Sequence, residues 1–360
     1  MNQDVEEGKN LNLENIWTTI YCCCLLFFFP LFMKNGYLDI MEAKTNFFLA
    51  VTVLYIVGML MIFAVKKIQE ETNIFSLRGE FGFIDCFCIL LIIDGCLGFI
   101  LNRFHSEILW AKEGKLFGFI FLFLCLVAYF FVARTFQMNQ GILWGALLGS
   151  IFTSIFVICS RFGIDVFHLY DMIVKNERAA FLGTLGQINV VASFFCIFIP
   201  FWIGCYLFSK DRTSKLLFGI ALFLSIMAGI SSNSDSIFLG IVAAYLCYLW
   251  FAFMSTKRLS AYLQCGSILC LSFVVLKIFT CMTKTGYAVK WDKLQNLILN
   301  QYLLWIILAI LLGAGSVFLK REFAEGLLIR IRTIIFIIIA SGIIVAIIMG
   351  IANQHSEVGN

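Results

Sequence analysis

Long apolar segments recur along the whole chain and leave little room for other kinds of structure. A helix needs about 20 apolar residues to cross the hydrocarbon core of a membrane. Scanning the 360 residues with that length gives about eleven candidate spans, at 16–33, 47–65, 82–101, 116–133, 142–160, 188–208, 216–230, 237–255, 262–280, 301–319 and 333–351. We therefore expect an all-α, polytopic helical bundle that forms a single transmembrane domain over residues 1–360.

The composition argues against a soluble protein. Apolar residues (AVILMFWYC) make up 61% of the chain and charged residues 13%, whereas soluble domains have about 45–50% and about 25%. One soluble core cannot hide this surplus, so lipid must cover it. The net charge of +4 is too small and too scattered to suggest binding to nucleic acid. Most of the cysteines lie in apolar runs, which indicates small hydrophobic side chains rather than disulfides or a metal site.

The distribution of Lys and Arg between the loops predicts the orientation. Inner loops are slightly richer in cations if the N-terminus is cytoplasmic, and tight basic turns near 210–215, 257–258 and 320–321 support this choice. The first span is not expected to be a cleaved signal peptide, because a polar, acidic segment precedes it and no small-residue cleavage site follows. The expected location is the cytoplasmic (inner) membrane, with several passes.

The loop at 161–187 is the most polar segment on the predicted outer side. It contains Arg161, His168 and Arg178, and its DVFHLYDMI segment is expected to form a short helix at the membrane surface. Outward cations and imidazoles suit an anionic ligand at that face. The alternative, that loops simply hold polar residues, stays open.

Two stretches are more specific. The first, GTLGQIN at 183–189, opens the sixth span. Gly183 and Gly186 allow close backbone approach to a ligand, while Gln187 and Asn189 present amides where a helix start favours an anion. The second stretch, SSNSDS at 231–236, offers hydroxyls and a carboxylate between two short spans. Each stretch also has a plain structural interpretation, as a capped helix start.

Taken together, these stretches resemble the O-antigen ligase and polymerase superfamily. The family pattern is an Arg, a Gly-Thr/Ser-x-Gly-Asn-x-Asn-like stretch that opens a helix ending in Pro, and a polar turn one helical hairpin later. Here the pattern is represented by Arg178, GTLGQINVVASFFCIFIP, the basic inner turn SKDRTSK and then SSNSDSIFLG. The motif-bearing part covers about 178–255.

The chain departs from the family pattern at three points. Gln187 replaces the usual Asn, and Asp235 stands where many members carry an Arg thought to bind the lipid diphosphate. The family also has a large outer loop late in the chain, followed by closing helices, whereas this sequence ends at residue 360 where such a loop would begin. The expectation is a shortened member that lacks this loop.

The resemblance implies an enzyme that transfers a glycan from a lipid diphosphate carrier to an acceptor hydroxyl at the outer face of the membrane. Its expected partners are an undecaprenyl-diphosphate-linked glycan, membrane lipid and other polysaccharide-export components, with no cofactor and no metal. Polymerisation and ligation both remain open. The expected catalytic residues are Arg178, His168 and Asp235, and the expected substrate-binding residues are Arg161, Gly183, Thr184, Gly186, Gln187, Asn189 and Ser234.

Charged residues inside predicted spans support a competing hypothesis. Asp94 lies well inside the third span with Asp85 near its inner edge, and Lys277 lies in the ninth. Such residues are costly in lipid and often mark ion or substrate paths. Asp94 and Lys277 would either pair as a structural contact or, in the case of Asp94, couple protons in a transporter or flippase. A non-catalytic membrane scaffold is the third hypothesis.

Overall fold

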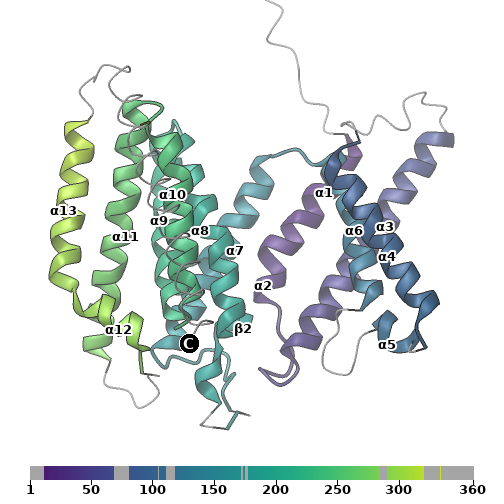
Figure 1. Ribbon diagram of the computed structural model, residues 1–360, viewed down its shortest axis with the longest axis horizontal. Helices are drawn as coiled ribbons and strands as arrows, with labels where there is room; N and C mark the ends of the chain where they lie inside the picture. Colours follow the sequence, from purple (N-terminus) through teal and green to yellow (C-terminus); the bar gives the residue numbers. More distant parts are fainter. Residues whose placement is uncertain are drawn as a thin grey trace, which may run out of the picture. The chain divides into compact units, whose positions relative to one another are not determined.

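The protein is almost entirely helical in the computed structural model, which describes residues 12–68, 81–103, 105–110, 118–171, 173–174, 177–283, 290–319 and 333. Its contacts divide the chain into two compact units (Figure 1). Unit 1 comprises Met1–Ser160 and Ile164–Gln187, and unit 2 comprises Arg161–Gly163 and Ile188–Asn360.

Unit 1 contains mainly antiparallel helices and one short hairpin. In chain order its elements are α1 (Leu13–Cys23), the π-helix η1 (Cys24–Phe28), α2 (Phe29–Leu31), α3 (Ile40–Ile68), α4 (Phe83–Leu101), α5 (His105–Trp110), α6 (Phe119–Thr135), α7 (Gln140–Arg161, whose last residue belongs to unit 2), the 3-10 turn η2 (Arg178–Ala180), β1 (Phe181–Leu182), the 3-10 turn η3 (Gly183–Leu185) and β2 (Gly186–Gln187). The strands β1 and β2 pair antiparallel, with Phe181 opposite Gln187.

Helices α1, η1 and α2 form one continuous span with a π-turn ahead of Pro30. Proline has no N–H, so the regular helical hydrogen-bond pattern must be interrupted near it. Helix α7 packs closely against this segment at glycines spaced four residues apart. A Cβ added to Gly149 would collide with the Leu26 carbonyl oxygen, and one added to Gly145 would lie 3.3 Å from the Cys23 sulfur. This small-residue stripe is typical of close helix packing in membranes.

Ion pairs join the helices of unit 1 where predicted inner loops meet the spans. Arg134 on α6 pairs with Asp85 at the start of α4 at 3.2 Å, and Lys66 pairs with Glu14. Asp85, expected near the inner edge of the third span, therefore has a structural partner. Its carboxylate also accepts a hydrogen bond from the Gly82 N–H.

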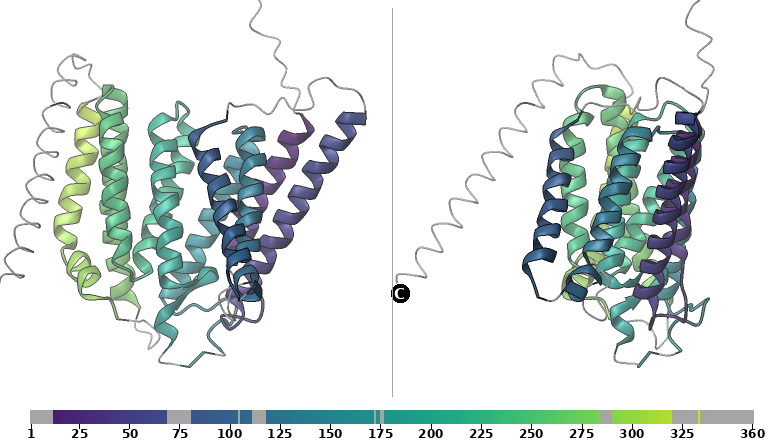
Figure 2. Two further views of the ribbon diagram at one scale, coloured as in Figure 1. Left: turned by 45° about the vertical axis from the view of Figure 1, so that its right-hand side comes forward. Right: turned by 90° about the vertical axis from the view of Figure 1, so that its right-hand side faces the viewer.

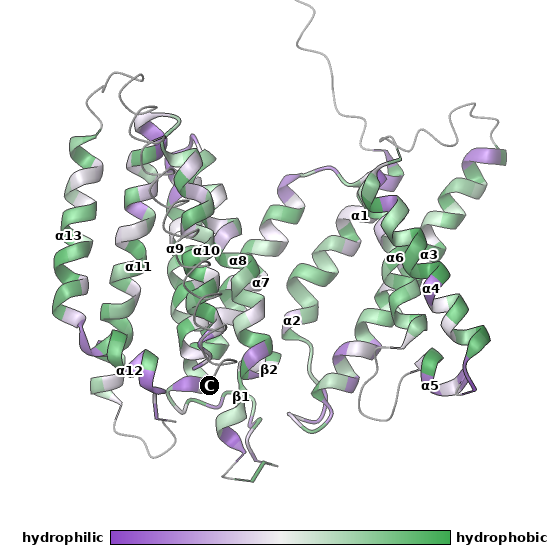
Figure 3. Ribbon diagram, viewed as in Figure 1, coloured by the Kyte–Doolittle hydropathy of each residue, from purple (hydrophilic) through white to green (hydrophobic). Residues whose placement is uncertain are grey.

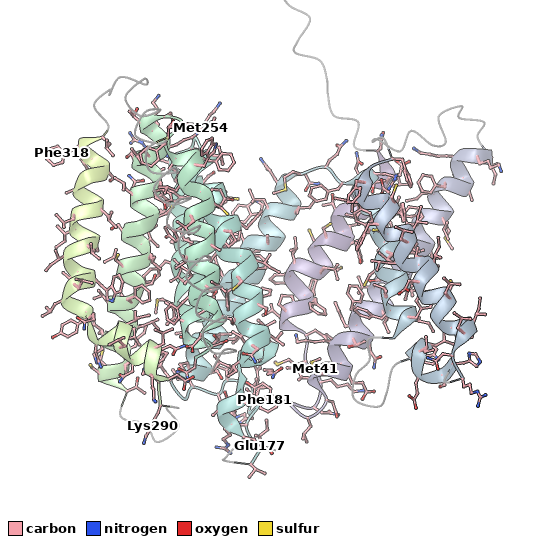
Figure 4. All side chains as sticks on the ribbon, in the orientation of Figure 1. Met41, Glu177, Phe181, Met254, Lys290 and Phe318 are labelled. Carbon is pink, nitrogen blue, oxygen red and sulfur yellow. The ribbon has the colours of Figure 1, made fainter. Side chains whose placement is uncertain are left out.

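Unit 2 is a bundle of helices. Its elements are α8 (Ile188–Phe208), α9 (Arg212–Ser231), α10 (Ser236–Ala252), α11 (Thr256–Met282), α12 (Lys293–Asn300) and α13 (Tyr302–Phe318). The long helices α8, α9, α10, α11 and α13 alternate in direction, and the short α12 is bent by 61° from α13 (Figure 1). Lys290 lies at one end of this unit, while Met254 and Phe318 lie at the other (Figure 4). The alternation agrees with the sides predicted from the sequence for these loops. Two further views show the same helices lying side by side (Figure 2).

The apolar surfaces of the helices support a multi-pass membrane protein. Green, hydrophobic colouring runs along the length of most helices, and polar colouring gathers near their ends (Figure 3). Many large apolar side chains on the long helices are exposed, such as Leu54 on α3 and Leu239 on α10. Soluble monomers rarely expose so much contiguous apolar surface, so lipid is the natural solvent for these faces.

The predicted number of spans was wrong. Within the residues that the structure describes, seven helices are long and apolar enough to cross a membrane, or eight if the bent pair α12 and α13 counts as one span. The predicted spans at 116–133 and 237–255 correspond to α6 and α10, which have 17 residues each. At 1.5 Å per residue such a helix covers about 25 Å, less than the usual hydrocarbon thickness. The predicted span at 333–351 lies outside the described residues, Thr333 excepted.

Candidate functional site

The sequence-predicted site residues are divided between the two units. Unit 1 holds Arg178, His168, Gly183, Thr184, Gly186 and Gln187, whereas unit 2 holds Arg161, Asn189, Ser234 and Asp235. Each group has its own local geometry, and the two groups differ in what they bring together.

The GTLGQ segment of unit 1 is a tight turn closed by the β1–β2 pair. Gly183 and Gly186 both have positive φ, +57° and +88°. These are conformations that side chains other than glycine adopt only at a cost. Gly183 also lies directly against α7, since a Cβ there would approach Val157 Cγ2 to 2.7 Å. The two glycines therefore serve the tight fold of this segment.

A chain of hydrogen bonds fixes the same turn. The Gly183 N–H donates to Ser160 Oγ at 3.2 Å, and Ser160 Oγ lies 2.7 Å from the Tyr170 hydroxyl. The Tyr170 hydroxyl donates to the Phe181 carbonyl at 2.9 Å. From the other side, the Tyr37 hydroxyl donates to the Gly183 carbonyl at 2.9 Å. Burial raises the pKa of Tyr37, and the neighbouring Tyr170 raises it further. The phenol therefore stays neutral and donates its hydrogen.

A small pocket lies beside the turn. Its empty volume is about 210 Å³, and it is lined by Phe156, Ser160, Ile164, Asp165, Val166, Phe167, Leu169, Gly183 and Thr184. Thr184 is fully buried, and its hydroxyl has no hydrogen-bond partner among the described residues. Much of that volume is open to solvent, and the enclosed part, about 10 Å³, suits a water molecule or a single hydroxyl group rather than a sugar unit.

The 164–174 part of the loop is not the surface helix that the sequence predicted. Its described residues form turns. The Asp165 carboxylate accepts from the N–H groups of Leu169 and Tyr170, both at 2.9 Å, and His168 has a φ of +53°. A left-handed residue interrupts a right-handed helix, and the side chain of Asp165 satisfies the amides that a helix would have used.

The two titratable candidates of this loop have local partners. Arg178 donates to the carbonyls of Tyr170 at 3.1 Å and Ile173 at 3.3 Å, which closes the loop on itself. His168 lies at the surface, 3.6 Å from the Asp171 carboxylate. Gln187 is exposed on β2. Neither Arg178 nor His168 lines the pocket.

In unit 2 the two sequence stretches meet. Ser234 Oγ donates to Asn189 Oδ1 at 3.1 Å, which joins the start of α8 to the loop between α9 and α10. Ser236 Oγ lies 2.8 Å from Ser234 Oγ and supplies it with a hydrogen bond in turn. Asn189 is exposed, and within the described residues no hydrogen bond engages its amide nitrogen. This amide is thus a donor available at the end of unit 2.

The neighbouring Asn233 holds a third segment in place. Its side chain donates to the Lys290 carbonyl at 3.3 Å and accepts from the Asp292 N–H at 3.0 Å. Trp291 lies between these two residues in the sequence, and the guanidinium of Arg161 stacks over its indole ring, 4.0 Å from the ring centre. Arg161 is buried, with 5% of its surface exposed. We call Arg161, Asn189, Asn233, Ser234 and Trp291 the polar cluster. It contains three of the predicted substrate-binding residues, Arg161, Asn189 and Ser234.

Asp235 lies beside the polar cluster and faces solvent. It precedes α10, but its side chain makes no capping hydrogen bond. The side chain of Asp235 therefore does not cap α10, and its carboxylate is exposed next to Ser234. No group of three or more His, Cys, Asp or Glu side chains in the part of the chain that the structure describes is arranged to hold a metal ion.

The sequence did not single out several residues that organise these sites. Tyr37, Ser160 and Tyr170 hold the glycine turn, and Trp291 supports Arg161 in the polar cluster. Aromatic residues in predicted outer loops were the available signal for Tyr170 and Trp291, because such residues anchor at membrane interfaces. Tyr37 and Ser160 are distant in sequence from the turn they contact, and no local pattern marks them.

Comparisons with models of protein families, with curated proteins and with solved structures found no significant match. The resemblance to the O-antigen ligase and polymerase superfamily therefore rests on the quoted motifs alone.

Proposed function

We propose that this chain is a membrane glycosyltransferase that polymerises or ligates lipid-diphosphate-linked glycan units at the outer face of the cytoplasmic membrane. The observation that carries the proposal is the hydrogen bond between Ser234 and Asn189. It joins the two stretches on which the family resemblance depends, 45 residues apart in sequence. In the proposed orientation, with the N-terminus cytoplasmic, this end of unit 2 faces outward.

The chemistry requires a donor site for a diphosphate and an acceptor site for a sugar hydroxyl. The acceptor oxygen attacks the anomeric carbon, and the bond from that carbon to the phosphate oxygen breaks. The diphosphate leaves with the electron pair, and the hydroxyl proton passes to a base. Cations must therefore neutralise the leaving group, and hydrogen-bond donors must orient the sugar.

The polar cluster and the neighbouring Asp235 supply groups of these kinds. Arg161 carries a permanent charge and is held on Trp291. The Asn189 amide is an exposed donor for a phosphate or sugar oxygen, while the exposed Asp235 carboxylate is the candidate base. Arg178 remains a second candidate cation, although its two hydrogen bonds to loop carbonyls also give it a structural role. Gln187 and Thr184 stay proposed substrate contacts.

The transporter hypothesis gains no specific support. Asp94 is exposed on α4 and does not line the pocket described above. Lys277 lies in unit 2, where it donates to the Asn300 side chain at 2.8 Å. We therefore propose the enzyme alone.

Complementation tests the proposal. The chain is expressed in a strain that lacks its own polysaccharide polymerase but makes the matching lipid-linked repeat unit, and glycan length is read on a gel. We expect a ladder of polymers from the wild-type chain. Asn189→Ala removes the exposed amide and the acceptor of the Ser234 hydroxyl, so the ladder should collapse to single units.

Asn102→Ala is the matched control, because Asn102 is an exposed asparagine outside the polar cluster. It should leave the ladder unchanged at equal membrane abundance. Single repeat units from the wild-type chain would refute polymerisation in this strain. A full ladder from Asn189→Ala would refute the role of the polar cluster.

A further inference from the structure

The end of unit 2 opposite the polar cluster is strongly basic. The turn between α8 and α9 and the first turn of α9 carry Lys210, Arg212 and Lys215, while the first turn of α11 carries Lys257 and Arg258. Met254, two residues before the start of α11, lies at this end, and Lys290 lies at the other (Figure 4). We call these five cations the basic end.

Side-chain contacts show that the two turns form one surface. The Lys215 ammonium lies 5.9 Å from the ring of Tyr206, and the Arg258 guanidinium lies 5.0 Å from the ring of Phe208. Tyr206 in turn donates its hydroxyl to Gln264 on α11 at 2.8 Å. The end of α8 thus lies between the starts of α9 and α11, with its aromatic rings supporting cations from both.

Acidic side chains do not neutralise this surface within the described ranges. Asp211 is the one acid in these two turns, and its carboxylate accepts from the N–H and hydroxyl of Ser214 as the N-cap of α9. None of the five cations forms an ion pair with a described residue. Lys210, Arg212 and Lys257 are also exposed. Their charge is therefore available to an external anion.

The position of these cations does not favour helix stability. Helices α9 and α11 both begin here, and the N-terminal end of a helix carries partial positive charge that favours acidic side chains. Neither helix has an acid in its first turn. The cations add to the two helix dipoles instead of opposing them. A strongly positive region at the ends of spanning helices lies at the depth of the lipid headgroups.

We propose that the basic end binds the phosphate headgroup of an anionic phospholipid in the adjoining leaflet. Arginine forks grip phosphate oxygens in a bidentate way, and lysines add point charges around them. The aromatic rings of Tyr206 and Phe208 lie beside the charged groups of Lys215 and Arg258 and help to hold these cations at the depth of the headgroups. This inference is independent of the proposed glycosyltransferase activity.

Native mass spectrometry of the full chain tests the proposal. The purified protein is mixed with equal amounts of phosphatidylglycerol and phosphatidylcholine of the same acyl chains, and the ratio of the two bound lipids is measured. We expect the wild-type chain to retain phosphatidylglycerol preferentially. The ratio should fall about fivefold for each cation removed, the effect expected of one Lys or Arg near an anionic surface. The test variant is Arg212→Gln with Lys257→Gln.

The control variant, Lys290→Gln with Lys293→Gln, removes the same charge from exposed residues at the other end of unit 2. It should keep the wild-type ratio. A wild-type ratio near one would overturn the proposal, as would an equal effect of the two variants.

A measurement on the wild-type chain covers the case in which the test variant does not fold. Phosphatidylglycerol should raise its unfolding temperature in detergent at low salt, and high salt should abolish the rise. Glycerol phosphate without acyl chains should have no effect. An equal rise with glycerol phosphate, or a rise that high salt leaves intact, would contradict a headgroup site.

Discussion

Replacing Gly183 with alanine should destabilise unit 1 severely. Gly183 has a φ of +57°, and a left-handed conformation costs a residue with a Cβ about 1–2 kcal/mol. The new methyl group would lie 2.7 Å from Val157 Cγ2, 3.0 Å from Val157 Cα and 3.1 Å from its backbone nitrogen. Because two of these atoms belong to the helix backbone of α7, rotation of a side chain cannot relieve the clash.

Overpacking of this kind typically costs about 1–3 kcal/mol, so the two effects together amount to about 2–5 kcal/mol. The assay is thermal unfolding of the purified chain in detergent, followed by circular dichroism. Gly98→Ala is the matched control, because a Cβ at Gly98 meets nothing within 4 Å. Gly98 lies within α4, where alanine is favoured over glycine by about 0.5–1 kcal/mol. Equal unfolding temperatures for the two variants would refute this reasoning.

Three further predictions concern charged groups. Lys44→Met should cost about 2–4 kcal/mol, because the buried ammonium donates to three carbonyls at the end of α2, and thermal unfolding measures the loss. An unchanged unfolding temperature would contradict this. Arg134→Met should destabilise the chain more than the double variant Asp85→Leu with Arg134→Met, because the single change leaves the Asp85 carboxylate without its partner. Thermal unfolding of both single variants and the double variant forms a double-mutant cycle, and additive effects in it would exclude coupling. The pKa of Asp211 is lowered, and the largest cause is the hydrogen bond that its carboxylate accepts from the Ser214 N–H. Its stabilising contribution is therefore present above the unfolded pKa of about 4 and is lost as the pH falls through the folded value. Asp211→Asn should show a smaller acid-induced drop in unfolding temperature than the wild-type chain, and an equal drop would refute this assignment.

The helical architecture followed from the sequence because apolar length is a strong signal. The starts of α8 and α4 lie within one residue of the predicted spans at 188–208 and 82–101. Helix bounds were harder to predict. Helix α6 begins at Phe119, three residues after the predicted start, and α10 ends at Ala252, three residues before the predicted end. Gly118 illustrates the reason: its backbone is extended, so local backbone conformation and not hydropathy sets the start of α6.

Contacts between distant residues were less predictable. Lys277 donates to Asn300 on the neighbouring short helix α12, a contact that no sequence spacing indicated. Asn189 and Ser234 belong to polar stretches on the same predicted side, and a hydrogen bond joins them in the structure. The sequence could not indicate that Trp291 would support Arg161, since no spacing rule links residues 130 positions apart.

The most direct test of the proposed function is reconstitution of the purified chain in lipid vesicles with its lipid-diphosphate-linked glycan. Both product length and released lipid diphosphate are measured. The proposed reaction predicts one lipid diphosphate released for each glycosidic bond formed, and loss of both products in Asn189→Ala. Movement of intact lipid-linked glycan across the vesicle membrane, with no diphosphate released, would contradict the enzyme assignment and favour transport.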